Sequence, residues 1–279
     1  MTQPQVWLND HLEAGDQARV SVLDRGFSVG DGVFETLKVT DGVAFALTRH
    51  LDRLVHSAHG MGLQVPAVDL VREGVEQLLA ANAQVLPATS RLRIQLTAGS
   101  GLAGSERSGG EPTLVITQTT ATVWPETSAV ITVPWTRNEN SPIAGFKTTS
   151  YADNVVALAR ANAVGATEAL FANTQGDLCE GTGSNVFVVV GDRLITPPLS
   201  SGCLPGITRA LVLEWIGAEE IAVPMSVLRE ADEVFITSST RDISPVHSID
   251  GQLVTHAPGP VTSAAQKVFA TQMTQTLDP

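Results

Sequence analysis

Strand patterns and helix patterns are mixed along this chain without strict alternation, and this order limits the possible folds more than any other feature. In the first part of the chain, strand patterns occur in the segments 6–10, 17–24, 33–39, 43–47, 91–98 and 113–120. Asp41-Gly42, a dipeptide typical of tight hairpin turns, separates two of them. Because hairpin-linked strands pair antiparallel, the sequence predicts an antiparallel sheet in an α+β fold.

Two helical segments interrupt the predicted strands. In the first, Thr48 is the candidate N-cap, apolar residues recur at helical spacing up to Ala58, and Gly60 or Gly62 ends the helix. The second covers roughly residues 69–83. We expect both helices to cover the sheet.

The segment GSGLAGSERSGGEP (99–112) lies between two predicted strands and is too long and polar for a tight hairpin. We expect its first part, residues 99–110, to be mobile, and it is a candidate lid. The segment ATVWPETSA (121–129) is typical of an interdomain connector. Two domains are therefore predicted, residues 1–120 and residues 121–279.

Composition and charge narrow the function classes. The 279 residues carry a formal net charge of -12, which argues against nucleic-acid binding because affinity for phosphate backbones needs clustered Lys and Arg. The chain has neither an apolar run of about 18 residues nor a signal-peptide pattern at its start, so no membrane role and a cytoplasmic location are expected. Cys179 and Cys203 lack metal-ligand spacing, and no metal site or disulfide is expected. The expected partner is a small molecule.

Lysine is rare in this chain. Of the 17 basic residues only three are lysines, Lys38, Lys147 and Lys267. Lys38 lies in a strand pattern and Lys267 in a C-terminal helical pattern, where solvated positions suit both. Lys147 instead stands in SPIAGFKTTSYADNVVALARA (141–161), among apolar, small and hydroxylic residues, four residues before the only tyrosine, Tyr151. It is the candidate for chemistry that needs an amine.

The second half of the chain contains further candidate groups. Glu180 lies between a strand pattern and a turn of small residues, and Gly206-Ile207-Thr208 begins a helical segment whose N-terminus favours an anion. Ser239 and Thr240 follow another predicted strand. An amine, an acid and two anion-binding termini match what pyridoxal phosphate requires for its Schiff base, its pyridine nitrogen and its phosphate. No dinucleotide-binding or Walker pattern follows a strand.

Six segments resemble the fold-type-IV pyridoxal-phosphate enzymes, which include branched-chain and D-amino acid aminotransferases and 4-amino-4-deoxychorismate lyase. The segments are DRGFSVGDGVFETLKV (24–39), HLDRLVHSA (50–58), FKTTSYADNVVA (146–157), CEGTGSNVFVV (179–189), TPPLSSGCLPGITR (196–209) and ADEVFITSSTRDISPV (231–246). They extend over nearly the whole chain. The resemblance implies a small N-terminal α/β domain, a larger C-terminal domain with a barrel-like sheet, a cofactor in the cleft between the domains, and a homodimer.

The resemblance also implies roles for individual residues. Lys147 forms the Schiff base with pyridoxal 5'-phosphate and transfers the substrate proton. Glu180 faces the pyridine nitrogen and Tyr151 reaches the ring hydroxyl. The implied phosphate ligands are Arg53, the backbone of Ile207 and Thr208, and Ser239 or Thr240.

Two reactions remain open under this resemblance. The predicted one is that of an aminodeoxychorismate lyase of the folate pathway, which eliminates pyruvate and forms 4-aminobenzoate, and the segments VGDGVFET (29–36) and SSTRDISPV (238–246) favour it. The alternative is an aminotransferase acting on D-amino acids or branched-chain amino acids with 2-oxoglutarate. A non-catalytic binder of a phosphate ligand is a remote third alternative, against which the presence of both Lys147 and Glu180 argues. Candidates for binding the substrate carboxylate are Arg91, Arg93, Arg107 and Arg241.

Overall fold

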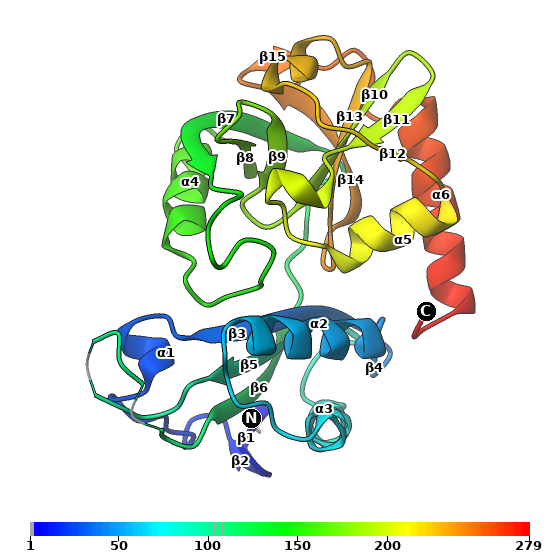
Figure 1. Cartoon of the computed structure of the whole chain (residues 1–279). Helices are drawn as coiled ribbons and strands as arrows, with labels where there is room; N and C mark the ends of the chain where they lie inside the picture. Colours follow the sequence, from blue (N-terminus) through cyan, green and yellow to red (C-terminus); the bar gives the residue numbers. More distant parts are fainter. Residues whose placement is uncertain (1–2, 103, 108) are drawn as a thin grey trace. The chain divides into compact units, whose positions relative to one another are not determined.

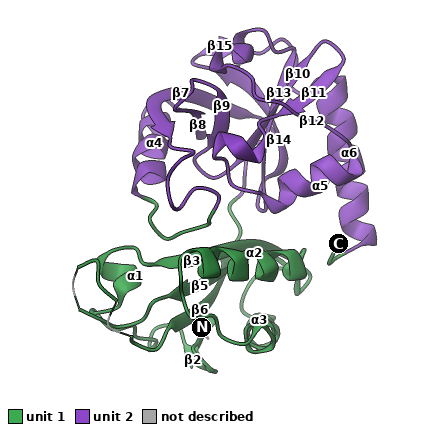
Figure 2. Ribbon diagram, in the orientation of Figure 1, with its two compact units in different colours: residues 1–122, 146–151, 277–279 green, residues 123–145, 152–276 purple. Residues whose placement is uncertain are grey.

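The computed structural model describes residues 3–102, 104–107 and 109–279 (Figure 1). It divides the chain into two compact units, which Figure 2 shows in different colours. The first unit consists of Met1–Thr122, Phe146–Tyr151 and Leu277–Pro279, and the second of Val123–Gly145 and Ala152–Thr276. A single cut after residue 120 was predicted, whereas in the structure the short segment that carries Lys147 also belongs to the first unit.

The first unit is an antiparallel sheet with helices packed on it. Its strand order is β2-β1-β6-β5-β3-β4. The strands are β1 (Gln5–Leu8), β2 (His11–Ala14), β3 (Gly32–Thr40), β4 (Val43–Ala44), β5 (Thr89–Thr97) and β6 (Thr113–Thr120), and the helices are α1 (Arg25–Ser28), α2 (Leu47–Gly60) and α3 (Val68–Asn82). Helix α2 packs on β3, and α3 packs on β1 and β6.

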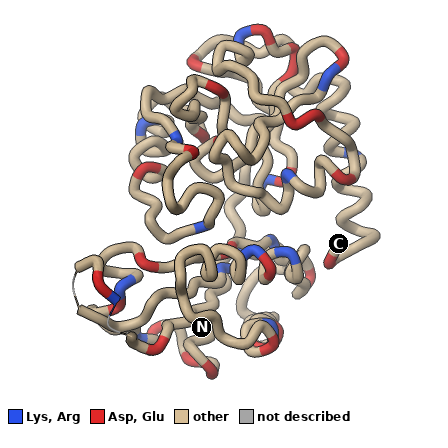
Figure 3. Tube along the Cα trace, in the orientation of Figure 1, with Lys and Arg blue, Asp and Glu red and all other residues tan. Residues whose placement is uncertain are grey.

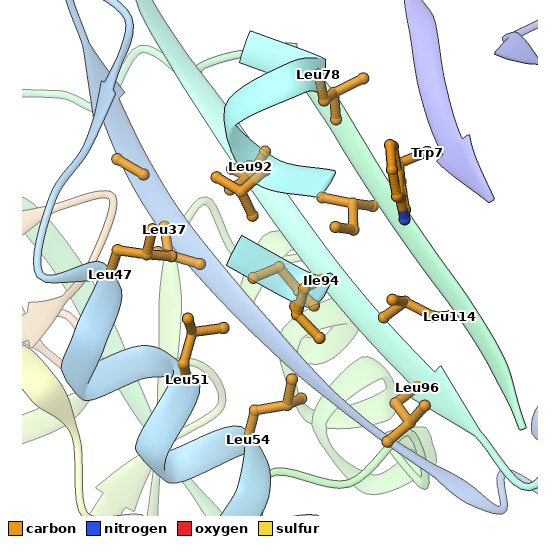
Figure 4. Close-up of a cluster of buried hydrophobic side chains, with 14 of the residues drawn as sticks. Trp7, Leu37, Leu47, Leu51, Leu54, Leu78, Leu92, Ile94, Leu96 and Leu114 are labelled. Carbon is orange, nitrogen blue, oxygen red and sulfur yellow. The ribbon is translucent and has the colours of Figure 1, made fainter. Parts of the chain in front are cut away.

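The core of the first unit lies between the sheet and helices α2 and α3. Leu51 and Leu54 of α2 and Leu78 of α3 belong to one buried apolar cluster with Leu92 and Ile94 of β5 (Figure 4). Because successive side chains of a strand point to opposite faces, Arg93, which lies between these two β5 residues, is on the other face of the sheet. The alternation of apolar and polar residues in β5 therefore gives the sheet one face in the core and an opposite face that carries polar side chains.

Two local predictions in this unit are wrong. Residues 17–24 form no strand; Val22 and Leu23 are 78% and 63% exposed, and β1 is already paired on both sides. Thr48 is not the N-cap of α2, because the cap is Ala46, in a left-handed conformation. The Thr48 N–H and Oγ1 instead donate to the Asp278 carboxylate at 2.8 and 2.6 Å, so a residue from the end of the chain takes over the capping.

The glycine-rich segment after β5 is tied down by arginines where the structure describes it. Arg25 Nη1 donates to the carbonyls of Leu102, Gly104 and Glu106 at 2.9 to 3.0 Å. Residues 103 and 108 of the predicted lid lie outside the described residues. The contacts of Arg25 hold the described part of this segment against α1.

The second unit is built on one large mixed sheet with the strand order β12-β11-β10-β13-β14-β7-β8-β9 and with β15 paired to β14. Its strands are β7 (Ser128–Arg137), β8 (Glu168–Asn173), β9 (Leu178–Gly181), β10 (Asn185–Val190), β11 (Arg193–Thr196), β12 (Glu219–Glu220), β13 (Glu233–Ser238), β14 (Asp242–Ile249) and β15 (Gln252–Leu253). Its helices are α4 (Ala152–Asn162), α5 (Ile207–Trp215) and α6 (Pro260–Gln275), with short 3-10 helices at Leu199–Ser201 and Met225–Arg229. Strand β9 also lies against β10, although four strands separate them in the strand order, so the sheet curls.

Together these elements confirm the predicted α+β fold with a curled, barrel-like sheet in the second unit. Helix α4 covers β7 and β8, whereas α5 and α6 pack on β13 and on each other. Lys and Arg are distributed over both units and interspersed with Asp and Glu (Figure 3). Within the described residues, none of the helices has the length and apolar character needed to cross a membrane.

Candidate active site

Lys147 lies in a segment that runs beside the start of β3 in the first unit. The Phe34 N–H donates to the Lys147 carbonyl at 3.0 Å, and the Thr149 N–H donates to the Gly32 carbonyl at 2.8 Å. The Lys147 N–H donates to Ser57 Oγ of α2 at 3.2 Å. The sheet and helix α2 therefore both fix the backbone that carries the lysine.

Phe146 anchors the same segment on α2. Its ring packs against His56 with the ring centroids 5.4 Å apart. A Cβ atom at Gly60 would lie 2.1 Å from the Phe146 ring, so any other residue here would force the ring to move. The sequence predicted Gly60 only as a helix stop, and its close approach to Phe146 is what the structure adds.

The ring of Phe34 is the centre of a group of side chains in the first unit. Lys147 Nζ lies 4.5 Å and Arg93 Cζ 3.8 Å from its centroid. Tyr151 packs edge-on against the same ring, with centroids 5.2 Å apart. A cation over an aromatic face is attracted by the ring quadrupole, so Phe34 helps to hold both charged groups. Three residues predicted from the sequence are thus brought together.

A buried charged cluster lies where β3 meets α2. Glu35 Oε1 accepts from Arg53 Nε at 2.8 Å, and Oε2 accepts from Arg53 Nη2 and from His50 Nδ1, both at 2.6 Å. Glu35, His50 and Arg53 are 0%, 1% and 8% exposed. Because an ionised carboxylate only accepts, Nδ1 of His50 carries the proton.

Electrostatics in this cluster keep Glu35 ionised. Burial by itself raises the pKa of Glu35, but the Arg53 guanidinium and His50 outweigh it and lower the pKa to about 2. Burial lowers the pKa of His50, and the positive charges of Arg53 and Lys147 lower it further against the opposing effect of Glu35. The cluster is therefore an ion pair of Arg53 and Glu35 supported by a neutral histidine.

In the second unit, Glu180 at the end of β9 is held by donors on both oxygens. Oε1 accepts from Arg137 Nε and Oε2 from the Leu204 N–H, each at 2.9 Å. Arg137 Nη1 in turn donates to Asn154 Oδ1 at 3.0 Å, and its guanidinium lies 4.1 Å from the centroid of the Phe171 ring. The orientation of Glu180 is therefore fixed by a side chain of β7, two strands away in the sheet, and by the backbone at Leu204.

The turn of small residues after Glu180 is fixed by a second buried acid. Glu168 is 2% exposed and accepts from the Thr182 N–H and from Ser184 Oγ, each at 3.0 Å. Asn154 donates to the Thr182 carbonyl. The sequence predicted the turn, whereas the carboxylate that supports it comes from β8.

The N-terminus of α5 has no side-chain cap among the described residues. Its N-cap is Gly206, and a Cβ atom there would lie 2.0 Å from Asn185 Oδ1, so a larger residue would displace the Asn185 side chain. Ile207 and Thr208 form the first turn, where backbone N–H groups and the helix dipole favour negative charge. On β13, opposite Asn185, Thr237 has a buried Oγ1 without a hydrogen-bond partner among the described residues.

Ser239 and Thr240 lie in the turn between β13 and β14. The Arg241 N–H donates to the Ser238 carbonyl at 3.2 Å and to Ser238 Oγ at 3.3 Å, which closes the turn. The two hydroxyl residues are half-buried. The structure thus places them at the end of a strand, as the sequence predicted.

The four arginines predicted to bind the substrate lie in different surroundings. Arg93 is next to Phe34, and Arg91, two residues earlier on β5, is exposed. Arg107 donates Nε and Nη2 to the carboxylate of Asp31 at 2.8 and 2.5 Å, and Nη1 to the Gly62 carbonyl at 2.9 Å. Arg107 therefore ties the glycine-rich segment to the start of β3.

Arg241 is held within the second unit. Its Cζ lies 3.6 Å from the Trp124 ring centroid, and Nη2 donates to the Thr167 carbonyl at 2.8 Å. Burial lowers the pKa of Arg241, and Glu168 opposes that effect. Arg93, in contrast, lies over the same Phe34 ring as Lys147.

The family model for amino-transferase class IV matches residues 32–249. The chain belongs to the class IV aminotransferase family. It is 32% identical to a putative branched-chain-amino-acid aminotransferase of Methanocaldococcus jannaschii, with 95% of each chain covered. It is 31% identical to D-alanine aminotransferase of Bacillus licheniformis, with 94% of each chain covered.

Solved structures in this family are similar along most of the chain. The branched-chain aminotransferase of Thermoproteus uzoniensis, solved with norvaline, has a TM-score of 0.89 at 28% identity and covers 95% of this chain and 93% of its own. A putative 4-amino-4-deoxychorismate lyase of Legionella pneumophila has a TM-score of 0.83 at 26% identity, with 92% and 96% covered. These similarities confirm the predicted family and its fold.

Membership of this family makes the protein a pyridoxal-phosphate-dependent enzyme, which confirms the predicted cofactor. The remote alternative of a non-catalytic binder therefore has no support. The residues present fit the cofactor: Lys147 supplies an amine, Glu180 an oriented acid, and the first turn of α5 backbone N–H groups of the kind that suit an anion. No group of His, Cys, Asp or Glu within the described ranges could hold a metal ion.

Several residues of the site were missed from the sequence alone. Glu35 could have been found, because it occupies an inward-facing position between the buried Val33 and Leu37 of β3. A charge at such a position needs a partner. No comparable signal marks Arg137, which lies 43 residues before Glu180.

Proposed function

We propose that this protein is an aminotransferase that transfers the amino group of an amino acid to a 2-oxo acid. The observation that carries the proposal is the match over nearly the full length to relatives named as branched-chain-amino-acid and D-alanine aminotransferases. The proposal agrees with a lysine whose backbone is fixed by β3 and α2 and with an acid that accepts from two donors. The substrate class is therefore an α-amino acid, D or branched-chain.

Lys147 would bind the cofactor and move the proton. Its backbone is fixed by β3 and α2 while its Nζ lies over the Phe34 ring, so the amine has a defined position from which to take a proton from the substrate carbon and return it. Pyridoxal phosphate, when bound, supplies an electron sink for the charge that this proton transfer leaves behind. Tyr151, which packs edge-on against the Phe34 ring, would reach the hydroxyl group of the cofactor ring.

The remaining proposed cofactor ligands are one carboxylate and a set of phosphate ligands. Glu180 would face the pyridine nitrogen, with Arg137 and the Leu204 N–H fixing its orientation. Arg53 would bind the phosphate from the first unit. From the second unit the phosphate would be bound by the N–H groups of Ile207 and Thr208 and by Ser239 or Thr240.

For the substrate carboxylate we favour Arg93 among the four arginines. It lies over the ring that also carries Lys147 Nζ, and Gln95 Oε1 accepts from its Nε at 3.1 Å and its Nη2 at 2.8 Å, which orients the guanidinium. An arginine fork suits a carboxylate. Arg93→Met is expected to raise KM more than Arg91→Met, and equal effects would remove this role.

An aminodeoxychorismate lyase remains the second candidate. The solved Legionella structure named as a putative enzyme of this type supports it, as do the segments 29–36 and 238–246. The product would be 4-aminobenzoate. In this reaction the same lysine would take the proton, but the substrate would then lose pyruvate instead of its amino group.

One experiment separates the two reactions. Purified protein loaded with cofactor is mixed with D-alanine or L-leucine without an oxo acid, and its absorbance is followed. An aminotransferase converts its cofactor to the amine form, and 2-oxoglutarate reverses the change. Fluorescent 4-aminobenzoate released from aminodeoxychorismate at an enzymatic rate, without conversion by either amino acid, would overturn the aminotransferase proposal in favour of the lyase.

We also propose that the protein is a homodimer. In the first unit, Phe27 and Leu102 are 79% and 70% exposed, close to the exposed Val22 and Leu23. The Gly101 N–H donates to the Leu23 carbonyl at 3.1 Å, which brings the two segments together. Exposed apolar patches mark contact surfaces. Sedimentation should therefore report a dimer that Phe27→Asp weakens and that Leu253→Asp, in an exposed position of the second unit, does not.

A further inference from the structure

The Glu35 carboxylate accepts two hydrogen bonds from one edge of the Arg53 guanidinium group. Nε and Nη2 of Arg53 donate at 2.8 and 2.6 Å, while His50 donates from Nδ1 at 2.6 Å. His50 and Arg53 are spaced i and i+3 on α2, so they share one face of the helix. A single strand residue thus fixes two side chains of the helix.

The surroundings of Glu35 indicate that the ion pair with Arg53 is not there mainly to stabilise the fold. Its neighbours on the same face of β3, Val33 and Leu37, belong to the apolar core. Burying an ion pair costs desolvation, and apolar residues of similar volume in its place are often at least as stable. What a buried bidentate pair supplies instead is a fixed geometry.

We propose that Glu35, supported by His50, is a positioning residue that fixes the guanidinium of Arg53 for the cofactor phosphate. The inference rests on the proposed role of Arg53 as a phosphate ligand. A planar guanidinium gripped along its Nε–Nη2 edge presents its Nη1 edge in the opposite direction. His50 holds the carboxylate itself in place through Oε2. Folding therefore already orders the Arg53 side chain, and phosphate binding does not carry the entropic cost of ordering it.

A different role for the cluster would act on Lys147. The charge of the lysine contributes to the lowered pKa of His50, so the two groups interact. A cluster that served the lysine would change the protonation of the Schiff base and would not discriminate between ligands with and without a phosphate. The experiment has to separate these two effects.

The test compares the affinities of the apoprotein for pyridoxal phosphate and for pyridoxal, which has the same ring and aldehyde but no phosphate. Both are followed by the Schiff-base absorbance, and the ratio of the two dissociation constants reports the phosphate contribution. The variants are Glu35→Gln, Arg53→Gln and the double variant. Asp31→Asn is the matched control, because Asp31 is another buried acid of this unit that pairs with two arginines.

The expected result is a loss of phosphate discrimination. Glu35→Gln should lower the advantage of pyridoxal phosphate over pyridoxal by about 10- to 100-fold, the effect that losing an orienting partner has at metal sites. Arg53→Gln should lower it at least as much. The double variant should add nothing to Arg53→Gln, because Glu35 acts only through the arginine. Asp31→Asn should leave the ratio unchanged.

The possible outcomes separate the positioning role of Glu35 from the proposed phosphate-binding role of Arg53. An unchanged ratio in Glu35→Gln with a lowered ratio in Arg53→Gln would overturn the inference and keep Arg53 as the phosphate ligand. An unchanged ratio in Arg53→Gln would remove both roles. Glu35→Gln could instead lower both affinities equally and shift the pH dependence of the Schiff-base absorbance. The cluster would then act on Lys147, and the inference would be overturned.

A folding defect does not end the test. If circular dichroism shows that Glu35→Gln is unfolded, His50→Gln replaces it, because this variant keeps the bidentate pair and removes only the support of the carboxylate. A fall of the ratio in the same direction, by a smaller factor, is expected. An unchanged ratio in His50→Gln would count against the inference.

Discussion

Each unit contains an arginine paired with a carboxylate at the candidate site, and the two pairs have opposite proposed roles. In the first unit the arginine, Arg53, is the proposed ligand, and Glu35 accepts hydrogen bonds from it. In the second unit the carboxylate, Glu180, is the proposed ligand, and Arg137 donates to it. The first pair is almost completely buried, whereas the side chains of Arg137 and Glu180 are 18% and 13% exposed.

This difference shows how the same pairing can prepare a site for opposite charges. A phosphate needs a cation that is already oriented, and a pyridine nitrogen needs an anion that is already oriented. In each unit the partner of the ligand residue comes from a different element and fixes its orientation. The following predictions test that comparison, beginning with the lysine that both pairs would serve.

The largest effect is expected for Lys147→Ala. Turnover should fall by about 10⁴-fold or more, because the variant loses both the covalent link and the proton-transferring base. Lys38→Ala and Lys267→Ala are the controls and should keep their activity. Borohydride reduction and peptide mapping should place the pyridoxyl group on Lys147. Similar turnover in all three variants would contradict the assignment.

Glu180→Gln should lower kcat by about 10²- to 10³-fold, since it removes a charge placed where charge changes during the reaction. The affinity for pyridoxal phosphate should change far less. Steady-state kinetics and a cofactor titration measure the two effects separately. A variant that loses affinity and keeps kcat would assign Glu180 to binding and would break the contrast between the two pairs.

Glu35→Gln should destabilise the protein by about 3 kcal/mol at neutral pH, because it leaves Arg53 without its charged partner. The pKa of Glu35 is lowered from 4.5 to about 2 in the folded state, so its contribution is complete above pH 4.5 and is lost as the pH falls towards 2. Urea unfolding of wild type and variant should therefore give curves that converge in acid.

The control for this measurement is Glu219→Gln, which breaks an exposed ion pair with Arg193 in the second unit. Exposed pairs contribute little to stability, so this variant should match the wild type over the whole pH range. A stability difference for Glu35→Gln that stayed constant from pH 7 to pH 3 would contradict the lowered pKa.

The smallest effect is expected for Arg137→Met. Glu180 would keep its contact with the Leu204 N–H, so kcat should fall only by about tenfold, a loss of about 1.4 kcal/mol. Arg193→Met, which removes an exposed arginine, should have no effect. If Arg137→Met were as damaging as Glu180→Gln, the arginine would be more than a support.

Much of the fold followed from local patterns. The alternation in β5 and the Asp41-Gly42 turn predicted an antiparallel sheet, and the spacing of apolar residues predicted α2 and α3. The failures were also local. Residues 17–24 have a strand pattern but form no strand, and Thr48 has a capping side chain outside the cap position.

The sequence by itself determined the candidate chemistry, because a rare lysine, an acid before a small-residue turn and a glycine at a helix start are visible as residue types. Only the tertiary structure decided what holds them. Glu35 and Arg53 lie 18 residues apart and Arg137 and Glu180 lie 43 apart, and each pair meets only after strands and helices pack. Contacts between distant segments depend on packing that no local pattern contains, so the partners that orient a site are what folding adds to a sequence.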